Sequence, residues 1–144
     1  MNAVDNKKAM EEVYGELEAG NPALFVERLA EDVTWSVIGS TRFSQTYSGK
    51  NAVLAHLAEA RSALESRIRI RVRRIIADTD WVAVKGTGTA RTKTGVDYNN
   101  TYCWVLGLNA DGKIREVTEY LDTELVTAAF GRVDPTNASS PAGK

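Results

Sequence analysis

Two polar residues at the end of the last predicted strand are the first candidates for chemistry. Tyr120 and Asp122 are two residues apart, in a segment that is otherwise mostly apolar. Residues two apart in an extended strand share a face, so the phenol and the carboxyl group would lie side by side. A carboxyl group enclosed by apolar groups has a raised pKa, and a neighbouring phenol can bind a carbonyl or enolate oxygen. The pair predicts acid–base catalysis, with Asp122 transferring the proton.

Asp122 also has a structural interpretation. It directly precedes residues 123–130, a segment predicted to be helical. An aspartate in this position can cap the helix by accepting backbone N–H bonds. Such bonds would lower the pKa of the carboxyl group, whereas a desolvated pocket would raise it. The direction of the shift therefore separates the two interpretations, and both are open at this point.

Aromatic and amide side chains on neighbouring predicted strands could form the walls of a pocket. Trp35 alternates with Val33 and Val37, so these residues share a face that we expect to point inward. Trp35 could be a core residue or the wall of a site for a flat or cyclic ligand.

Asn99 and Asn100 are unusual in a strand, and they point to opposite faces, so at most one lies in a pocket. Asn100 shares its face with Tyr102 and Trp104. A hairpin with a regular Asp111-Gly112 turn instead groups Asn99 with Asp122, and the sequence leaves the choice open.

The single histidine, His56, falls in the middle of a predicted helix. It could form a dyad with a carboxylate, or it could be a structural or exposed residue. Because there is no second histidine and no ligand cluster, no metal site is predicted. The alternating arginines of residues 67–73 predict a solvated sheet face or a dimer interface rather than a surface for an anionic partner.

The elements that must position these residues follow from the hydrophobic pattern. Helices are predicted at 6–18, 22–30, 50–65 and 123–130, and strands at 33–38, 43–47 (short), 67–73 and 81–91, followed by the hairpin around Asp111-Gly112. Arg74 breaks the arginine alternation and predicts a bulge. This order predicts an α+β fold, with helices over one face of a curved sheet and a pocket at its open end. Residues 1–131 would form one domain and residues 132–144 a disordered tail.

The composition and net charge of the chain limit the kinds of partner that the protein is expected to bind. The chain has 144 residues, 43% of them hydrophobic and 26% charged, with a net charge of −1. That charge provides no strong field, so neither nucleic acid nor a membrane is expected as a partner. No apolar run is long enough for a membrane span, and the N-terminus lacks the apolar core of a signal peptide, so a cytoplasmic location is expected.

Three segments carry a resemblance to a known family. EDVTWSVIGS (31–40), YSGKNAVLAHL (47–57) and DGKIREVTEYLDTEL (111–125) resemble the nuclear-transport-factor-2-like superfamily, and within it the SnoaL-like and ketosteroid-isomerase-related proteins. The resemblance implies a cone-shaped, curved mixed or antiparallel sheet wrapped around helices, a cystatin-like α+β barrel with an internal pocket. It also implies a cofactor-free site for a small hydrophobic organic molecule, and a homodimer formed through the open sheet face.

The resemblance also bears on single residues. The base position of ketosteroid isomerases aligns with Val37, and the arginine and second aspartate of limonene-epoxide-hydrolase-like enzymes fall near Thr87 and Thr89. Neither mechanism is therefore expected. The closing-strand aspartate of SnoaL-like cyclases matches Asp122, and the resemblance favours Asn100 over Asn99 as the pocket residue.

The sequence thus predicts a pocket protein for a small hydrophobic or cyclic molecule. As an enzyme it would be a cofactor-free isomerase, cyclase or hydratase that uses Asp122 and Tyr120, with Trp35, Val37, Trp104 and an asparagine at the ligand. The alternatives are a non-catalytic small-ligand binder and a dimeric adaptor of the same fold.

Overall fold

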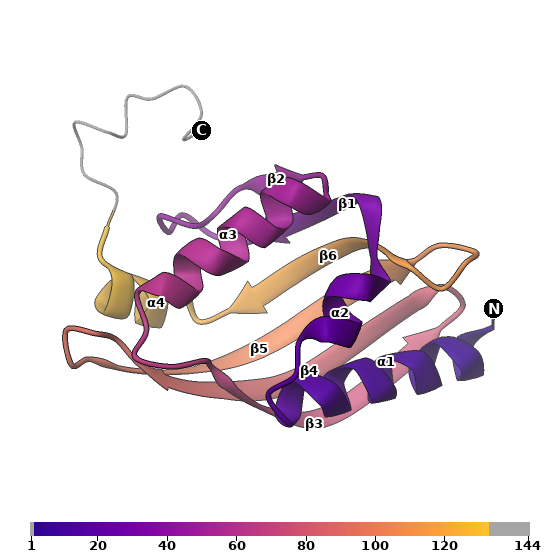
Figure 1. Cartoon of the computed structure of the whole chain (residues 1–144), viewed down its shortest axis with the longest axis horizontal. Coiled ribbons are helices and arrows are strands. Elements are labelled where there is room, and N and C mark those ends of the chain that lie inside the picture. Colours follow the sequence, from indigo (N-terminus) through magenta and orange to yellow (C-terminus); the bar gives the residue numbers. More distant parts are fainter. Residues whose placement is uncertain (1, 133–144) are drawn as a thin grey trace.

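The computed structural model describes residues 2–132, which form a curved six-stranded sheet and four helices (Figure 1). The helices are α1 (Ala3–Glu18), α2 (Ala23–Arg28), α3 (Lys50–Ser62) and α4 (Thr123–Phe130). The strands are β1 (Leu29–Val37), β2 (Thr46–Ser48), β3 (Arg69–Asp78), β4 (Trp81–Arg91), β5 (Asp97–Leu108) and β6 (Ile114–Leu121). Within residues 2–132, no helix is long and apolar enough to cross a membrane. The expected disordered tail lies outside the described residues from residue 133 onward.

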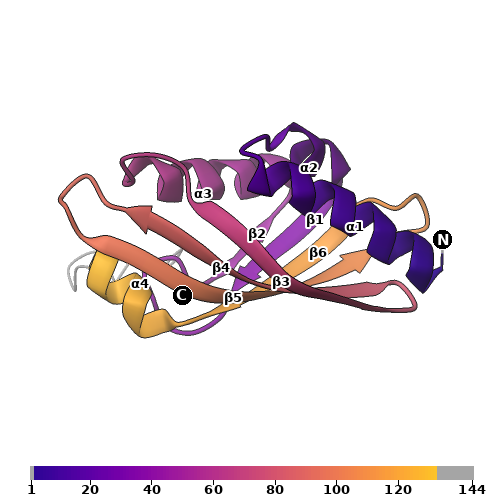
Figure 2. The ribbon, with the colours of Figure 1, turned by 90° about the horizontal axis from the view of Figure 1, so that it is seen from below.

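The sheet order is β2-β1-β6-β5-β4-β3, and all neighbours are antiparallel except β1 and β6, which are parallel. Helices α1, α2 and α3 cover one face of the sheet, and α4 lies at one end of it (Figure 2). The predicted α+β architecture of a curved sheet with helices on one face is confirmed. The hydrophobic residues of the helices meet the inward faces of β1, β4, β5 and β6 in one large core.

The edge strand β3 follows the predicted alternation. Its arginines are exposed, while Ile70 and Val72 are partly buried against the core. The register shifts between Val72 and Arg74, so the predicted bulge is present. The Glu18 side chain of α1 accepts a hydrogen bond from the Val72 amide at this bulge, which ties the helix to the sheet edge.

Glycine in β4 makes room for an aromatic side chain of the next strand. A Cβ atom on Gly88 would lie 2.9 Å from the Tyr102 ring and 2.7 Å from Ile68. A side chain here would therefore push the Tyr102 ring away from β4. This close approach fixes one wall of the site described below.

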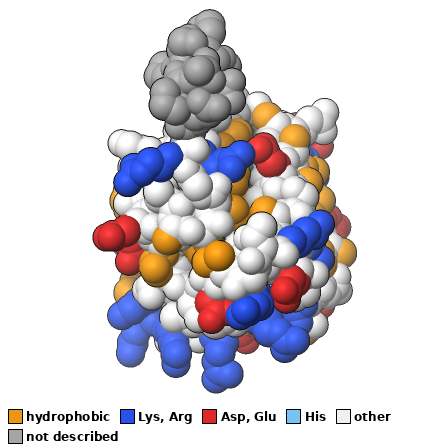
Figure 3. All heavy atoms as spheres, turned by 90° about the vertical axis from the view of Figure 1, so that its left-hand side faces the viewer, with side chains coloured by type: hydrophobic (Ala, Val, Ile, Leu, Met, Phe, Trp, Pro, Cys, Tyr) orange, Lys and Arg blue, Asp and Glu red, His pale blue; other side chains and the backbone are white. Residues whose placement is uncertain are grey.

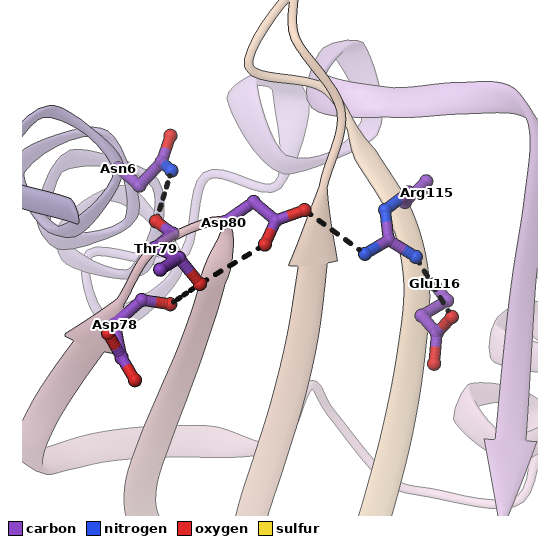
Figure 4. Close-up of polar contacts among 6 residues, drawn as sticks. All are labelled: Asn6, Asp78, Thr79, Asp80, Arg115 and Glu116. Carbon is purple, nitrogen blue, oxygen red and sulfur yellow. Dashed lines mark hydrogen bonds and ion pairs between the residues drawn. The ribbon is translucent and has the colours of Figure 1, made fainter. Parts of the chain in front are cut away.

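A polar network ties the end of the sheet opposite α4 (Figure 4). Asn6 of α1 donates to the Thr79 carbonyl at 3.0 Å, in the β3–β4 turn, where Thr79 has a φ of 51°. The next residue, Asp80, pairs with Arg115 of β6 at 3.4 Å, and Arg115 also contacts Glu116 at 3.1 Å. These contacts join α1, the β3–β4 turn and β6, so this end is held by polar contacts while the other end is lined by aromatic side chains.

Asp122 caps α4, and this role can be tested by stability. Its Oδ1 accepts hydrogen bonds from the Glu124 and Leu125 amides, at 3.0 and 3.3 Å. We expect Asp122→Ala to lower the free energy of unfolding by about 1 kcal/mol, because the first turn loses its side-chain acceptor. Asp122→Asn should lose much less, since asparagine caps about as well. Urea unfolding of both variants measures this, and equal losses would contradict the cap.

Candidate active site

Two adjoining apolar cavities lie between the helices and the sheet. The larger, about 340 Å³, is lined by α1, α2, α3 and the inward faces of β1, β3, β5 and β6. The smaller, about 130 Å³, extends toward α4. Both are bordered by Leu57, Ile68, Tyr102 and Glu119. The larger cavity has a volume typical of sites for small organic ligands. At the α4 end of the molecule, hydrophobic side chains reach the surface among charged ones (Figure 3).

Glu119 of β6 places a carboxyl group where the two cavities meet. Its Oε2 accepts a hydrogen bond from Trp104 Nε1 at 3.0 Å, and its Oε1 accepts one from Trp35 Nε1 at 3.3 Å. The strand register explains this, because Glu119 pairs with Trp104 on β5, and Trp35 lies on β1 on the other side of β6. An indole N–H can only donate, so both tryptophans hold the carboxyl oxygens as acceptors.

Burial raises the pKa of Glu119, and the hydrogen bonds from Trp104 and Trp35 oppose part of that rise. The side chain is only half-buried by accessible surface because it borders the cavities, yet protein surrounds it closely and removes most of its hydration. Desolvation is therefore the larger effect, and the pKa of Glu119 shifts upward. A carboxyl group in this setting takes up and releases a proton closer to neutral pH than an exposed glutamate does.

A second polar group is a hydrogen-bonded set of β5 side chains. Tyr102 donates its hydroxyl to Tyr98 at 3.1 Å, and Asn100 Nδ2 donates to the same Tyr98 oxygen at 3.0 Å. The Tyr102 ring stacks on Trp104 with centroids 4.7 Å apart. Burial raises the pKa of both tyrosines, so both phenols stay protonated at neutral pH. Tyr98 and Tyr102 border the smaller cavity as hydrogen-bonding groups.

His56 of α3 also borders the smaller cavity and is 7% exposed. Its ring stacks on Tyr47 with centroids 4.0 Å apart and meets Phe43 edge-on at 5.6 Å. Desolvation lowers its pKa to about 4, so the imidazole is neutral at physiological pH. His56 is therefore not an exposed residue, and both the structural interpretation and the dyad with a carboxylate remain predictions.

The structure does not place Tyr120 and Asp122 in the cavities. Tyr120 is 47% exposed, and Asp122 is an exposed residue that caps α4. Both project to the opposite face of β6 from Glu119 and Leu121, which border the smaller cavity. The expected placement of the pair on the cavity face is thus wrong by one residue in the alternation of the strand. The carboxyl group at the cavities is Glu119.

Three of the remaining predicted residues border the cavities, and one of the two asparagines supports the backbone behind them. Trp35 and Trp104 border the larger cavity, and Val37 borders the smaller one. Asn99 is exposed, whereas Asn100 is 2% exposed, on the face that also carries Tyr102 and Trp104.

Asn100 supports the backbone at the end of β6 in addition to binding Tyr98. It donates to the Asp122 carbonyl at 3.1 Å and accepts from the Asp122 amide at 3.0 Å. The amide side chain therefore fixes the point where β6 passes into α4. In this way Asn100 connects the position of α4 to the Tyr98 hydroxyl.

Sequence reasoning missed Glu119, although a signal was present. Val117, Glu119 and Leu121 alternate along β6, so the glutamate occupies a position on the apolar face of the strand. The pattern was obscured because Tyr120, on the opposite face, is also a large hydrophobic residue, so that face could equally have been the one that points inward. Among residues 2–132, no group of three or more histidine, cysteine, aspartate or glutamate side chains is arranged to hold a metal ion.

The comparison with known structures supports the same architecture. A protein of unknown function with a cystatin-like fold from Xanthomonas campestris is 27% identical, with a TM-score of 0.77 over 92% of this chain and 100% of that one. A putative SnoaL-like polyketide cyclase from Jannaschia sp. CCS1 is 15% identical, with a TM-score of 0.75 over 92% and 95%. TerC, crystallised with polyporic acid, is 21% identical, with a TM-score of 0.72 over 85% and 95%.

No curated protein matches the chain. The family model for the SnoaL-like domain matches residues 10–117, which contain the second half of α1, the whole of α2 and α3, and strands β1 to β5. The cone-shaped, cystatin-like fold expected from the sequence is confirmed by the neighbours above. On this match, which covers more than half of its residues, the chain belongs to the SnoaL-like domain family.

Proposed function

We propose that this protein binds a small hydrophobic cyclic molecule and catalyses a cofactor-free acid–base reaction on it, of the isomerase, cyclase or hydratase type. Glu119 is the proton-transfer group. The observation that carries the proposal is a carboxyl group with a raised pKa, held by two indole donors where two apolar cavities meet. An isolated carboxyl group in an apolar interior is costly, and such groups concentrate at functional sites.

The chemistry follows from the positions of the donors. Each Glu119 oxygen accepts one indole N–H and keeps a further lone-pair direction free for a ligand. In an isomerisation, the carboxylate takes a proton from a carbon next to a carbonyl group, and the carboxylic acid then returns it to another carbon of the same molecule. The proton count balances, and neither oxidant nor metal takes part. The raised pKa makes the carboxylate a stronger base than an exposed glutamate.

The ligand class is supported by the cavity walls and by two structural neighbours. The larger cavity is lined by aromatic and aliphatic side chains, and Glu119 is the only carboxyl group among the described residues that line it. TerC was crystallised with polyporic acid, and the Jannaschia protein is described as a putative polyketide cyclase. A ring system with one or a few oxygen substituents fits these walls.

Two other roles make different use of the same fold. A non-catalytic binder needs the cavities but no proton transfer. A homodimer, with or without catalysis, would use the outer face of the sheet, where Ile76, Trp81 and Tyr120 are exposed. The strand register places these three residues on one face, opposite the cavities.

Deuterium exchange tests the catalytic role without knowledge of the natural substrate. 2-Tetralone is a bicyclic ketone with an exchangeable C–H beside its carbonyl group. We expect the wild-type protein to accelerate exchange at this carbon in D2O, followed by proton NMR. Glu119→Gln should reduce the acceleration by roughly 10²–10⁴-fold, because the base is removed.

Asp122→Asn is the matched control. It removes the second carboxylate near the end of β6, and the asparagine keeps the helix cap. Its exchange rate should stay close to that of the wild type. Loss of exchange in Asp122→Asn with retention in Glu119→Gln would return the catalytic role to Asp122. Binding of 2-tetralone without any acceleration by the wild type would establish a binding protein instead.

The raised pKa of Glu119 also predicts how stability depends on pH. The folded state binds this proton more tightly than the unfolded chain, where the pKa is about 4.5. The contribution of Glu119 to stability is therefore complete below pH 4.5 and is lost as the pH rises through the folded pKa. The free energy of unfolding of Glu119→Gln minus that of the wild type should become more positive from pH 4 to pH 8.

Urea unfolding across this pH range measures the difference in the free energy of unfolding between the two proteins. The test is how this difference changes with pH, and its absolute value is not part of the test. A glutamine can accept only one of the two indole bonds through its oxygen, so the variant carries a cost that does not depend on pH. A difference that is flat with pH would contradict the raised pKa.

A further inference from the structure

We propose that the smaller cavity receives a carbonyl oxygen of the ligand, and that His56 donates a hydrogen bond to this oxygen, with Tyr98 as the second donor. The inference rests on the proposed function, because it concerns the ligand of the same site. It narrows the substrate class to neutral cyclic ketones and related carbonyl compounds, with the ring in the larger cavity and the oxygen in the smaller one.

The imidazole of His56 is held in a fixed orientation. Tyr47 stacks on one side of the ring, with an interplanar angle of 15°, and Phe43 meets it edge-on. The Tyr47 hydroxyl in turn donates to the Phe43 carbonyl at 2.8 Å, which joins the two aromatic neighbours. A donor that is fixed before the ligand arrives loses little entropy on binding.

The hydrogen bonding of the ring identifies the donor atom. Nδ1 is fully enclosed and has no hydrogen-bond partner among the described residues. An enclosed N–H without a partner is rarer than an enclosed bare acceptor, so the proton belongs on Nε2. Nε2, unlike Nδ1, is not fully enclosed, and the ring borders the smaller cavity. The Nε2–H is therefore free for a ligand acceptor.

Tyr98 supplies the second donor from the opposite wall. Its oxygen already accepts from Tyr102 and Asn100, so its own proton is left for another partner. Phe130 packs against both sides of this cavity, with its ring 5.0 Å from Tyr98 and 5.2 Å from Phe43. The two donors thus belong to one cluster of contacting aromatic rings at the smaller cavity.

Glu119 completes the arrangement, because it borders the same cavity. When its carboxylate takes the proton from the carbon, the C–H electron pair moves into a C=C bond and the carbonyl oxygen becomes an enolate. Hydrogen-bond donors at that oxygen stabilise the developing charge. A neutral His56 does this without forming an ion pair with Glu119, so the carboxylate remains basic.

NMR of the imidazole nitrogens gives the first test, since His56 is the only histidine and its signals need no assignment. In the uniformly ¹⁵N-labelled wild type we expect the neutral Nε2–H form at pH 7, with unprotonated Nδ1. Addition of 2-tetralone should shift the Nε2 and Hε2 signals, whereas tetralin, which lacks the oxygen, should leave them nearly unchanged. Protonation on Nδ1, or the same response to both compounds, would overturn the assignment.

A matched pair of variants tests the contribution to binding. His56→Gln keeps a neutral N–H near the position of Nε2, whereas His56→Leu removes it, and both lose the stacking on Tyr47. We expect His56→Leu to weaken 2-tetralone binding by roughly three- to tenfold, as for one hydrogen bond, with tetralin affinity unchanged. His56→Gln should retain most of the preference for the ketone. The infrared band of the bound carbonyl should move to higher wavenumber in His56→Leu alone.

The outcomes separate this inference from the proposed function. If deuterium exchange depends on Glu119 while His56→Leu leaves the carbonyl band and the ketone preference unchanged, the donor role is wrong and the catalytic role stands. If the wild type binds 2-tetralone through His56 without exchange, the donor role stands and catalysis is wrong. No binding of 2-tetralone to the wild type would overturn the assigned ligand class.

Discussion

Removing the Glu119 carboxyl group from water is the constraint on which the rest of the site depends. A buried carboxylate without partners would cost several kcal/mol. Here the indole N–H groups of Trp35 and Trp104 offset part of that cost, and they reach Glu119 only because β6 lies between β1 and β5. The parallel pairing of β1 with β6 is therefore what brings one of the two donors to the carboxyl group, although Trp35 and Glu119 are far apart in the chain.

Around this carboxyl group the fold separates two tasks. The larger cavity is almost entirely apolar and, in the proposed function, provides shape and area for a ring system. The smaller cavity carries the directional groups His56 and the tyrosine pair, together with Arg61, among aromatic and aliphatic side chains. Asn100 links the second cavity to the backbone of α4, so a displacement of that helix would also displace the Tyr98 hydroxyl. Precise polar groups at one end and a permissive wall at the other are common in small-molecule sites.

The sequence predicted most of the architecture, because each amphipathic segment carries its own periodicity. The β3 bulge, the limits of β4 and the position of α4 were all read from local patterns. The site was less accessible, because it depends on which face of β6 points inward. At the end of β6 each face carries one carboxylate and one aromatic or aliphatic side chain, Glu119 with Leu121 and Tyr120 with Asp122, so the local pattern supports either face. The choice is made by tertiary contacts with Trp35 and Trp104, which no window of β6 contains.

The bonding of Glu119 to two tryptophans has an optical consequence. Indole emission responds to hydrogen bonding and to nearby charge, so the protonation state of one carboxyl group is coupled to the fluorescence of two of the three tryptophans in the chain. The third, Trp81, lies on the outer face beneath the Arg115 guanidinium, 4.8 Å from its ring centroid, and is separate from the cavities. The fluorescence of Trp35 and Trp104 thus reports the charge of the carboxyl group between the two cavities, and Trp81 on the far side of the sheet serves as an internal reference.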